Sequence, residues 1–191
     1  MAKTLIKERA EYQRYIIDYL VNDNGFIERK YNETNYDQVN AMDRKLFLSF
    51  IKDTQDEGYQ KILRQYGGNA DDIIVNKYND LVLSKNGMTL DALKHGFDVG
   101  LEHFDLLYTK PTTDINTKSI EDYNKNRFSV MEEVYHKEGE RIDLVLFLNG
   151  IPLFAIELKA NTSGQNYKDA IKQWRNDRTP TSRLSQWKTG A

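Results

Sequence analysis

The stretch RIDLVLFLNGIPLFAIELKA, residues 141–160, predicts two buried strands joined by a tight turn in an otherwise polar chain. The turn is marked by Asn149-Gly150, a dipeptide typical of β-hairpins when it lies between two apolar runs. Three charged side chains interrupt those runs: Asp143, Glu157 and Lys159. Because a charge on a buried strand needs a partner or a metal ion, these three residues are the first candidates for a functional site.

The length of the turn decides which faces of the hairpin the charges occupy. A two-residue turn would pair Leu148 with Ile151, and it would therefore pair Asp143 with Ile156. Because side chains alternate between the two faces of a strand, the two later charges would then lie on the face opposite Asp143. This register would scatter the charged groups.

A three-residue loop, with Gly150 left-handed in a bulge, would reverse that outcome. Asp143 would lie opposite Ala155, and all three charges would share one face. We expect this longer loop, because its register also gathers apolar side chains in a continuous core layer on the other face. That layer would contain Leu144, Leu146, Phe154, Ile156 and Leu158.

The composition indicates one soluble globular domain. The chain has 191 residues, of which 39% are hydrophobic and 29% charged, and its mean hydropathy is −0.71. No apolar run approaches the roughly 20 residues that cross a bilayer, and the N-terminus lacks the apolar core of a secretory signal. The absence of cysteine excludes disulfides, zinc fingers and thiol nucleophiles. We therefore expect a cytoplasmic protein without membrane contact.

Hydrophobic spacing divides the domain into a helical N-terminal part, about residues 1–96, and a strand-rich core, about residues 97–178. Helices followed by consecutive strands and a further helix are typical of an α/β fold with a mixed or antiparallel central sheet flanked by helices. We expect helices at 5–21, 43–53, 69–85, 89–95 and 166–177, and strands at 97–108 and 127–136 besides the opening hairpin.

The three hairpin charges have a clear chemical use if they lie together. Two neighbouring carboxylates, here Asp143 and Glu157, repel each other unless a cation sits between them. Carboxylate oxygens and the carbonyl of Leu158 are ligands that suit Mg²⁺, and Lys159 would orient or help deprotonate a water molecule for phosphodiester hydrolysis. The alternative is an ion pair of Lys159 with either carboxylate at the rim of an ordinary sheet.

The hairpin and its flanks resemble the PD-(D/E)xK nuclease superfamily, and more narrowly the N-terminal nuclease domain of the restriction (R) subunit of type I restriction–modification enzymes. RIDLVLFLNGIPLFAIELK is close to the core motif of that family. TSGQNYKDAIKQWRNDR downstream, and NRFSVMEEVYH and KERAEYQRYIIDYLVNDNGF upstream, also resemble family segments. The resemblance implies a restriction-endonuclease-like core and a Mg²⁺-dependent site-specific deoxyribonuclease that cuts double-stranded DNA.

The resemblance assigns roles residue by residue. Asp143 and Glu157 would be metal ligands, with the Leu158 carbonyl beside them, Lys159 would be the catalytic lysine, and Gln173 a polar helper from the following helix. The sequence departs from the family pattern after Gln173: a tryptophan stands where tyrosine is usual, and an aspartate stands where related nucleases carry a tyrosine. The role of Gln173 therefore rests on less than the roles of the three charges.

The resemblance also implies an additional acidic residue near the N-terminus. Glu8 is the best match for this further metal ligand, with Glu11 as an alternative, and a solvated helix residue is the ordinary interpretation of Glu8. Gln165, in the loop before the last helix, could assist in the same way as the helper glutamine or contact DNA.

The formal net charge of −2 means that the chain as a whole is not a basic DNA-binding surface. We therefore expect DNA contacts only where positive charge is concentrated, in the C-terminal part. Residues 160–191 carry six Lys or Arg against two Asp, and a local basic surface suffices to hold phosphates. The candidates are Gln165, Lys168, Lys172, Arg175 and Arg178. For Arg183 and Lys188 we favour an exposed basic face that docks on a motor domain.

The chain contains no G-x-x-x-x-G-K-[ST] phosphate loop. R subunits carry an ATP-driven DNA translocase after the nuclease domain, so the resemblance implies a fragment of a longer chain, with ATP used only by that motor. The modification and specificity subunits would be its partners. Two alternatives remain: a stand-alone PD-(D/E)xK nuclease in DNA repair or resolution, and a non-catalytic interaction domain of the same fold.

Overall fold

The protein is described by a computed structural model that covers residues 2–34, 36–84, 88–113, 115–159, 167–177 and 182–185. The longest helix, α1 (Ala2–Asn24), leads into strand β1 (Ile27–Lys30) and the short helix α2 (Tyr31–Thr34). Four helices follow: α3 (Arg44–Thr54), α4 (Asp56–Tyr66), α5 (Ala70–Leu83) and α6 (Thr89–His95).

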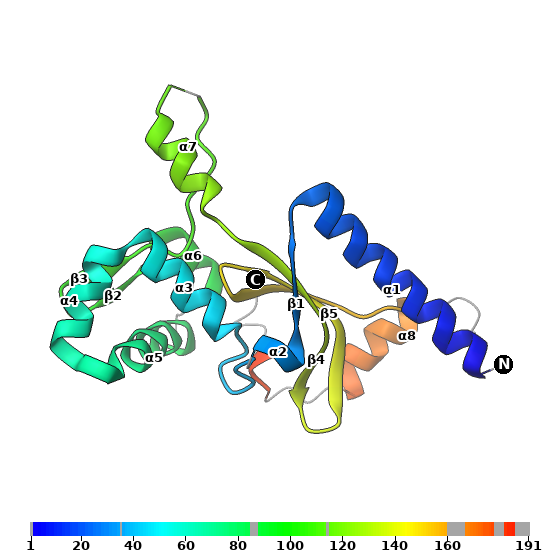
Figure 1. The fold of residues 1–191 in the computed structure, drawn as a ribbon. Coiled ribbons are helices and arrows are strands. Elements are labelled where there is room, and N and C mark those ends of the chain that lie inside the picture. The colour runs from blue at the N-terminus through cyan, green and yellow to red at the C-terminus, as the bar shows by residue number, and fades with distance from the viewer. Residues whose placement is uncertain are drawn as a thin grey trace.

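The second half of the chain contributes most of the strands. The short strands β2 (Phe97–Val99) and β3 (Glu102–Phe104) form a hairpin of their own, and helix α7 (Thr117–Asn124) stands away from the body (Figure 1). Strands β4 (Phe128–Lys137), β5 (Glu140–Leu148) and β6 (Ile151–Ile156) then run consecutively. The last helix, α8 (Tyr167–Lys172), continues as a π-helical turn, Gln173–Asp177.

The main sheet has the strand order β1-β4-β5-β6, with β1 parallel to β4 and the other pairs antiparallel. It is a mixed sheet flanked by helices, which confirms the predicted α/β class. The structure places β1 in the part that we predicted to be helical. Its four residues are too few for a period to stand out in the sequence.

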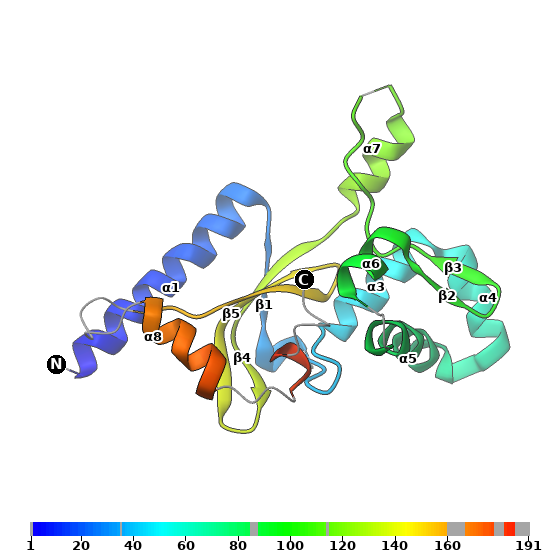
Figure 2. The same cartoon turned by 180° about the vertical axis from the view of Figure 1, so that it is seen from behind.

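Helices cover the sheet from two sides and extend it at one end (Figures 1 and 2). Helix α1 packs on one face through Ile17, against Val130, Leu144 and Leu158. The opposite face buries Met131, Val145 and Phe147 under Tyr36 and Trp174, among others. Helices α3 to α6 and the β2–β3 hairpin form a separate apolar cluster beyond the Asn149-Gly150 end of the sheet, with Phe47, Phe50 and Phe104 fully buried.

The turn of the β5–β6 hairpin differs from the predicted three-residue loop. Leu148 pairs with Ile151, so Asn149-Gly150 is a two-residue turn, and both residues have positive φ. The extra residue that we had placed in the turn lies further along β6, where the register shifts between the pairs Phe147↔Pro152 and Leu146↔Phe154. The prediction that Ala155 lies opposite Asp143 is therefore wrong, because Ala155 pairs with Val145.

The bulge nevertheless restores the predicted assignment of faces. Leu144, Leu146, Ile156 and Leu158 all belong to the cluster under α1, as expected. Phe154 does not join this layer and is 60% exposed, because β6 is an edge strand and the far end of α1 does not cover it.

Capping residues mark two helix boundaries. Helix α3 begins after Asp43, whose carboxylate accepts the Leu46 N–H, and α6 ends at a left-handed Gly96 with φ +65°. The helix predicted over 5–21 begins earlier, since α1 starts at Ala2. The strand predicted over 97–108 is divided into the β2–β3 hairpin by a turn at Gly100.

One buried ion pair joins the helical end to the sheet. Arg29 of β1 donates Nε to the carboxylate of Asp43 over 2.8 Å, and the Asp43 side chain is fully buried. The Asp43 N–H donates to the carbonyl of Gly150, so the same residue contacts the hairpin turn. None of the described helices combines the length and apolar character needed to cross a bilayer.

Candidate active site

Asp143 lies in the middle of the sheet and is almost completely buried, with 1% exposure. Its strand, β5, is flanked by β4 and β6. The carboxylate Oδ2 accepts a hydrogen bond from the backbone N–H of Leu158 over 2.7 Å. A buried carboxylate thus holds the segment that follows β6 against the centre of the sheet.

The register of the hairpin brings Glu157 next to Asp143. Leu144 pairs with Ile156, so the following residues, Asp143 and Glu157, are neighbours across the strands and point to the same face. The side chain of Glu157 is 5% exposed, and that of Lys159 is 14% exposed. Lys159 Nζ lies 3.3 Å from Glu157 Oε1. The three charges gather on one face, as predicted, and the ion pair considered as an alternative is formed.

The donor set is one that a hard cation prefers. Two nearly buried carboxylates and the main chain of Leu158 converge, and oxygen ligands of this kind suit Mg²⁺. Within the described residues no group of three or more Asp, Glu, His or Cys side chains is arranged to hold a metal ion. Further ligands of such a metal ion would come from water, from substrate, or from side chains other than the described ones.

Helix α1 packs beside the residues that directly follow β6, since Ile17 and Leu158 share one apolar cluster (Figure 1). Glu8 lies in the N-terminal half of α1, but its side chain is outside the described part. Glu11 is exposed. The buried contact of α1 with the sheet is made by Gln13, which donates Nε2 to Glu132 of β4 over 3.1 Å. Sequence reasoning did not single out this pair.

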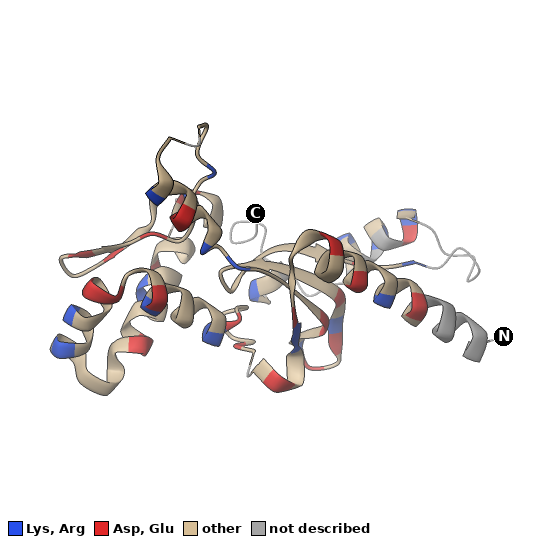
Figure 3. Ribbon diagram, turned by 45° about the horizontal axis from the view of Figure 1, so that its top comes forward, with Lys and Arg blue, Asp and Glu red and all other residues tan. Residues whose placement is uncertain are grey.

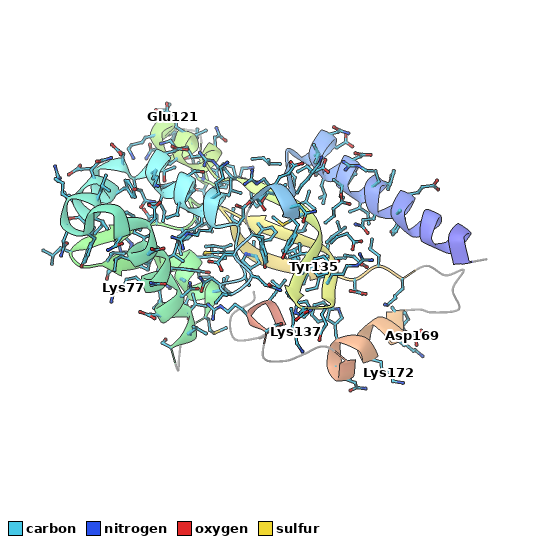
Figure 4. All side chains as sticks on the ribbon, turned by 60° about the horizontal axis from the view of Figure 1, so that its bottom comes forward. Lys77, Glu121, Tyr135, Lys137, Asp169 and Lys172 are labelled. Carbon is cyan, nitrogen blue, oxygen red and sulfur yellow. The ribbon has the colours of Figure 1, made fainter. Side chains whose placement is uncertain are left out.

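The basic residues of α8 are only partly described. Lys168, Lys172 and Arg175 are exposed, and Lys172 projects from α8 away from the sheet (Figure 4). Gln173 begins the π-helical turn, and its side chain is outside the description. Gln165, Arg178 and Lys188 lie outside the described residues. Charges of both signs are spread over α1 and α3 to α5, without a face of single sign (Figure 3).

Arg183 does not form the exposed basic face that we expected. It is about half-buried and donates Nη2 to Asn79 of α5 over 3.3 Å. Burial lowers the pKa of its guanidinium from the ordinary value. This short C-terminal turn therefore packs on the protein itself, since Leu184 also contacts the cluster around Phe147.

Two further charged residues beside Asp143 were missed from the sequence. Glu133 of β4 lies opposite Asp143, between the pairs Glu132↔Leu144 and Val134↔Ile142. Its backbone is left-handed, with φ +53°, and its carboxylate Oε2 lies 2.6 Å from Nε of Arg141. Alternation along β5 could have placed Arg141 on the face of Asp143, whereas no sequence signal marks the conformation of Glu133.

Comparison with known proteins identifies a family that the chain matches. The family model described as type I restriction enzyme R protein N terminus matches residues 6–188. A Methanocaldococcus jannaschii protein named "putative type I restriction enzyme MjaVIIIP endonuclease subunit" is 28% identical over 162 residues, which cover 81% of this chain and 15% of that protein. A second protein of that organism, "putative type I restriction enzyme MjaIXP endonuclease subunit", is 34% identical over 84 residues, covering 41% of this chain and 8% of that protein. No solved structure matches.

Proposed function

Because the chain belongs to the family of type I restriction enzyme R protein N termini, we propose that it is a Mg²⁺-dependent endonuclease domain. It would hydrolyse phosphodiester bonds of double-stranded DNA. The chain spans 15% of the length of the first curated relative, so the activities of a complete R subunit are part of this proposal and not of the finding.

The observation that carries the proposal is the placement of Asp143, Glu157 and Lys159 on one face of the sheet, with little exposure of any of them. Two nearly buried carboxylates that are close neighbours repel each other. A divalent cation between them would relieve that repulsion.

The residues present fit a magnesium ion. Asp143 and Glu157 would hold it through carboxylate oxygens. The Leu158 carbonyl would be a further oxygen ligand, since the N–H of the same residue already meets the Asp143 carboxylate. When bound, the ion would supply positive charge that stabilises the phosphorane-like transition state and favours ionisation of a nearby water molecule.

The remaining steps would use side chains of the chain itself. Lys159, as an ammonium, would exchange its contact with Glu157 for one with the attacking water and orient it, while the proton of that water would pass to a phosphate oxygen of the substrate. That water would form the new P–O bond as the bond to the deoxyribose oxygen breaks, and the leaving oxygen would take up a proton from solvent. Gln173 would assist from the turn after α8, and Glu8 would add a ligand from α1.

The proposal extends to the fold and the partners. A mixed sheet with flanking helices and the acid–acid–lysine group at one face is compatible with a restriction-endonuclease-like core. DNA would be contacted by one polar residue, Gln165, and by four basic residues, Lys168, Lys172, Arg175 and Arg178. An ATP-driven translocase C-terminal to the domain, and the modification and specificity subunits, would deliver the DNA in the cytoplasm.

Metal binding is the direct test. Mn²⁺ is titrated calorimetrically into wild type, Asp143→Asn and Glu157→Gln, with Glu121→Gln on α7 as a control of equal charge change. We expect saturable binding in wild type and in the control, and none in the two site variants. Cleavage of plasmid DNA is then measured for Lys159→Ala, for which we expect binding of metal without cleavage.

Two outcomes would contradict the proposal. Unchanged Mn²⁺ binding in both site variants would show that the metal ion binds at another place in the protein. Full cleavage activity of Lys159→Ala would remove the catalytic role of that lysine and leave the Lys159–Glu157 ion pair as a structural contact.

A further inference from the structure

Glu133 and Arg141 extend the charged face on the β4 side of Asp143. Glu133 lies opposite Asp143, and Arg141, two residues before Asp143 on β5, pairs with Tyr135 of β4. On the other side of Asp143 lies the segment after β6, because Leu158, between Glu157 and Lys159, donates its N–H to the Asp143 carboxylate. Figure 4 shows Tyr135 on this part of the sheet, on the same side of the molecule as α8.

The guanidinium of Arg141 is accessible to a ligand. Its side chain is 51% exposed, unlike Arg29, whose side chain is 22% exposed and whose partner is fully buried. The contact with Glu133 is an ion pair of Nε without the alignment of a hydrogen bond. Within the described residues no hydrogen bond engages the two outer guanidinium nitrogens of Arg141, and a planar pair of donors of this kind suits phosphate.

The position of Arg141 matches a phosphate near the one at Asp143. Two residues along a strand span about 7 Å. Phosphates of one DNA strand succeed each other every 3.4 Å or so along the helix axis. A guanidinium two residues from the proposed metal ligand would thus reach a phosphate one or two nucleotides from the bond to be cut.

We propose that Arg141 binds a DNA phosphate beside the scissile bond, and that Glu133 is a positioning residue that holds the guanidinium at this place. This inference rests on the proposed nuclease function. A carboxylate across from Asp143 would be free to approach a metal ion if its backbone were extended. The left-handed conformation of Glu133, which is uncommon for a residue with a side chain, directs it to Arg141 instead.

The test measures duplex binding without cleavage. Fluorescence anisotropy of a labelled DNA duplex in EDTA is recorded over a range of salt concentrations for wild type, Arg141→Gln and Arg64→Gln. Arg64, on α4, is exposed and remote from the sheet, and its substitution removes the same charge. Losing one phosphate contact should weaken binding about tenfold and reduce the slope of log K against log salt by about 1 in Arg141→Gln alone.

Further variants separate positioning from charge. Arg141→Lys should keep the salt slope but lose part of the affinity, because an ammonium lacks the paired donors. Glu133→Gln should bind DNA at least as tightly as wild type, since a negative charge is removed, while its kcat for cleavage falls. The last pattern is not expected of a residue that only stabilises the fold. Thermal melts of each variant check folding.

An unchanged salt slope in folded Arg141→Gln overturns this inference while leaving the nuclease proposal intact. Equal loss in Arg64→Gln also overturns it, because the effect would then be general charge. Failure of wild type to bind the duplex at all would overturn both proposals. Cleavage that survives in Asp143→Asn would overturn the metal site proposed at Asp143, while the salt slope of Arg141→Gln would still report whether Arg141 holds a phosphate.

Discussion

Asp143 and Leu158 are joined by a hydrogen bond of 2.7 Å from the Leu158 N–H to the buried carboxylate. The bond connects β5 to the segment immediately after β6, which carries Glu157 and Lys159. The Asp143 side chain therefore has two roles: it positions the segment that carries Glu157 and Lys159, and it is itself one of the three charged groups. Different substitutions of Asp143 can separate these roles.

Asp143→Asn should keep the fold and lose the metal. The amide oxygen of asparagine can still accept the Leu158 N–H, whereas Asp143→Ala leaves that buried donor without its acceptor, a loss of about 1–3 kcal/mol. We expect urea unfolding to show the larger destabilisation for alanine. Calorimetry should show no Mn²⁺ binding for either variant. Equal stability of the two variants would mean that the hydrogen bond is unimportant.

Gly150→Ala should destabilise the protein more than Gly139→Ala. Both glycines have positive φ, +84° and +76°, so both substitutions carry the cost of a left-handed alanine, about 1–2 kcal/mol. A Cβ at Gly150 would also lie 2.5 Å from Asp43 O and from Phe47 N, whereas at Gly139 it meets nothing within 4 Å. We expect about 1–3 kcal/mol more for Gly150→Ala. Equal losses of unfolding free energy for the two variants would show that Asp43 and Phe47 can shift to make room for the new methyl group.

Arg29→Met should strongly destabilise the folded state. It leaves the fully buried carboxylate of Asp43 without its cation, and breaking a buried pair costs about 3–5 kcal/mol. Lys118→Met is the control, because that lysine is 82% exposed in its pair with Asp122 and such pairs contribute about 0–1 kcal/mol. Thermal and urea unfolding of the two variants give the comparison. Similar values would argue against Asp43 as the junction of sheet and helices.

Glu28 should contribute stability that depends on pH. Its hydrogen bond from Arg14, which links α1 to β1, lowers its pKa below the ordinary value of 4.5. A depressed carboxyl pKa stabilises the folded state above pH 4.5, and this contribution is lost as pH falls through the lower, folded-state value. The difference in unfolding free energy between wild type and Glu28→Gln should therefore shrink on acidification.

The control for Glu28 is Glu33→Gln in α2, whose carboxylate is 69% exposed in a looser pair with Lys30 at 3.6 Å. Wild type and this variant should follow the same pH profile in urea unfolding. A difference between wild type and Glu28→Gln that stays constant with pH would indicate lost packing instead of lost ionisation.

Local signals in the sequence determined most elements of the fold. Helix α3 follows from the helical spacing of its apolar residues, and the end of helix α6 follows from Gly96 after it. The hairpin follows from Asn149-Gly150 between apolar runs. These features depend on neighbours a few residues apart, so they can be read without the rest of the chain. The family resemblance likewise rests on contiguous motifs, and the family match agrees with it.

The register of the hairpin was decided by tertiary packing. We expected an extra residue in the turn to set which side chains of the two strands share a face. In the structure the extra residue is Leu153, within β6. At the turn, Gly150 is in close contact with Asp43 and Phe47, which leaves no space for a longer loop. The bulged Leu153 packs toward the helical cluster, while Leu146 and Ile156 stay under α1.

The sequence by itself pointed to Asp143, Glu157 and Lys159, because charged residues within apolar strands need a partner or a metal ion. Only the tertiary structure decided what lies opposite them: Glu157 across from Asp143 on one side, and a left-handed Glu133 on the other. The physical reason is that alternation has a period of two within one strand, whereas pairing between strands depends on bulges that packing elsewhere selects.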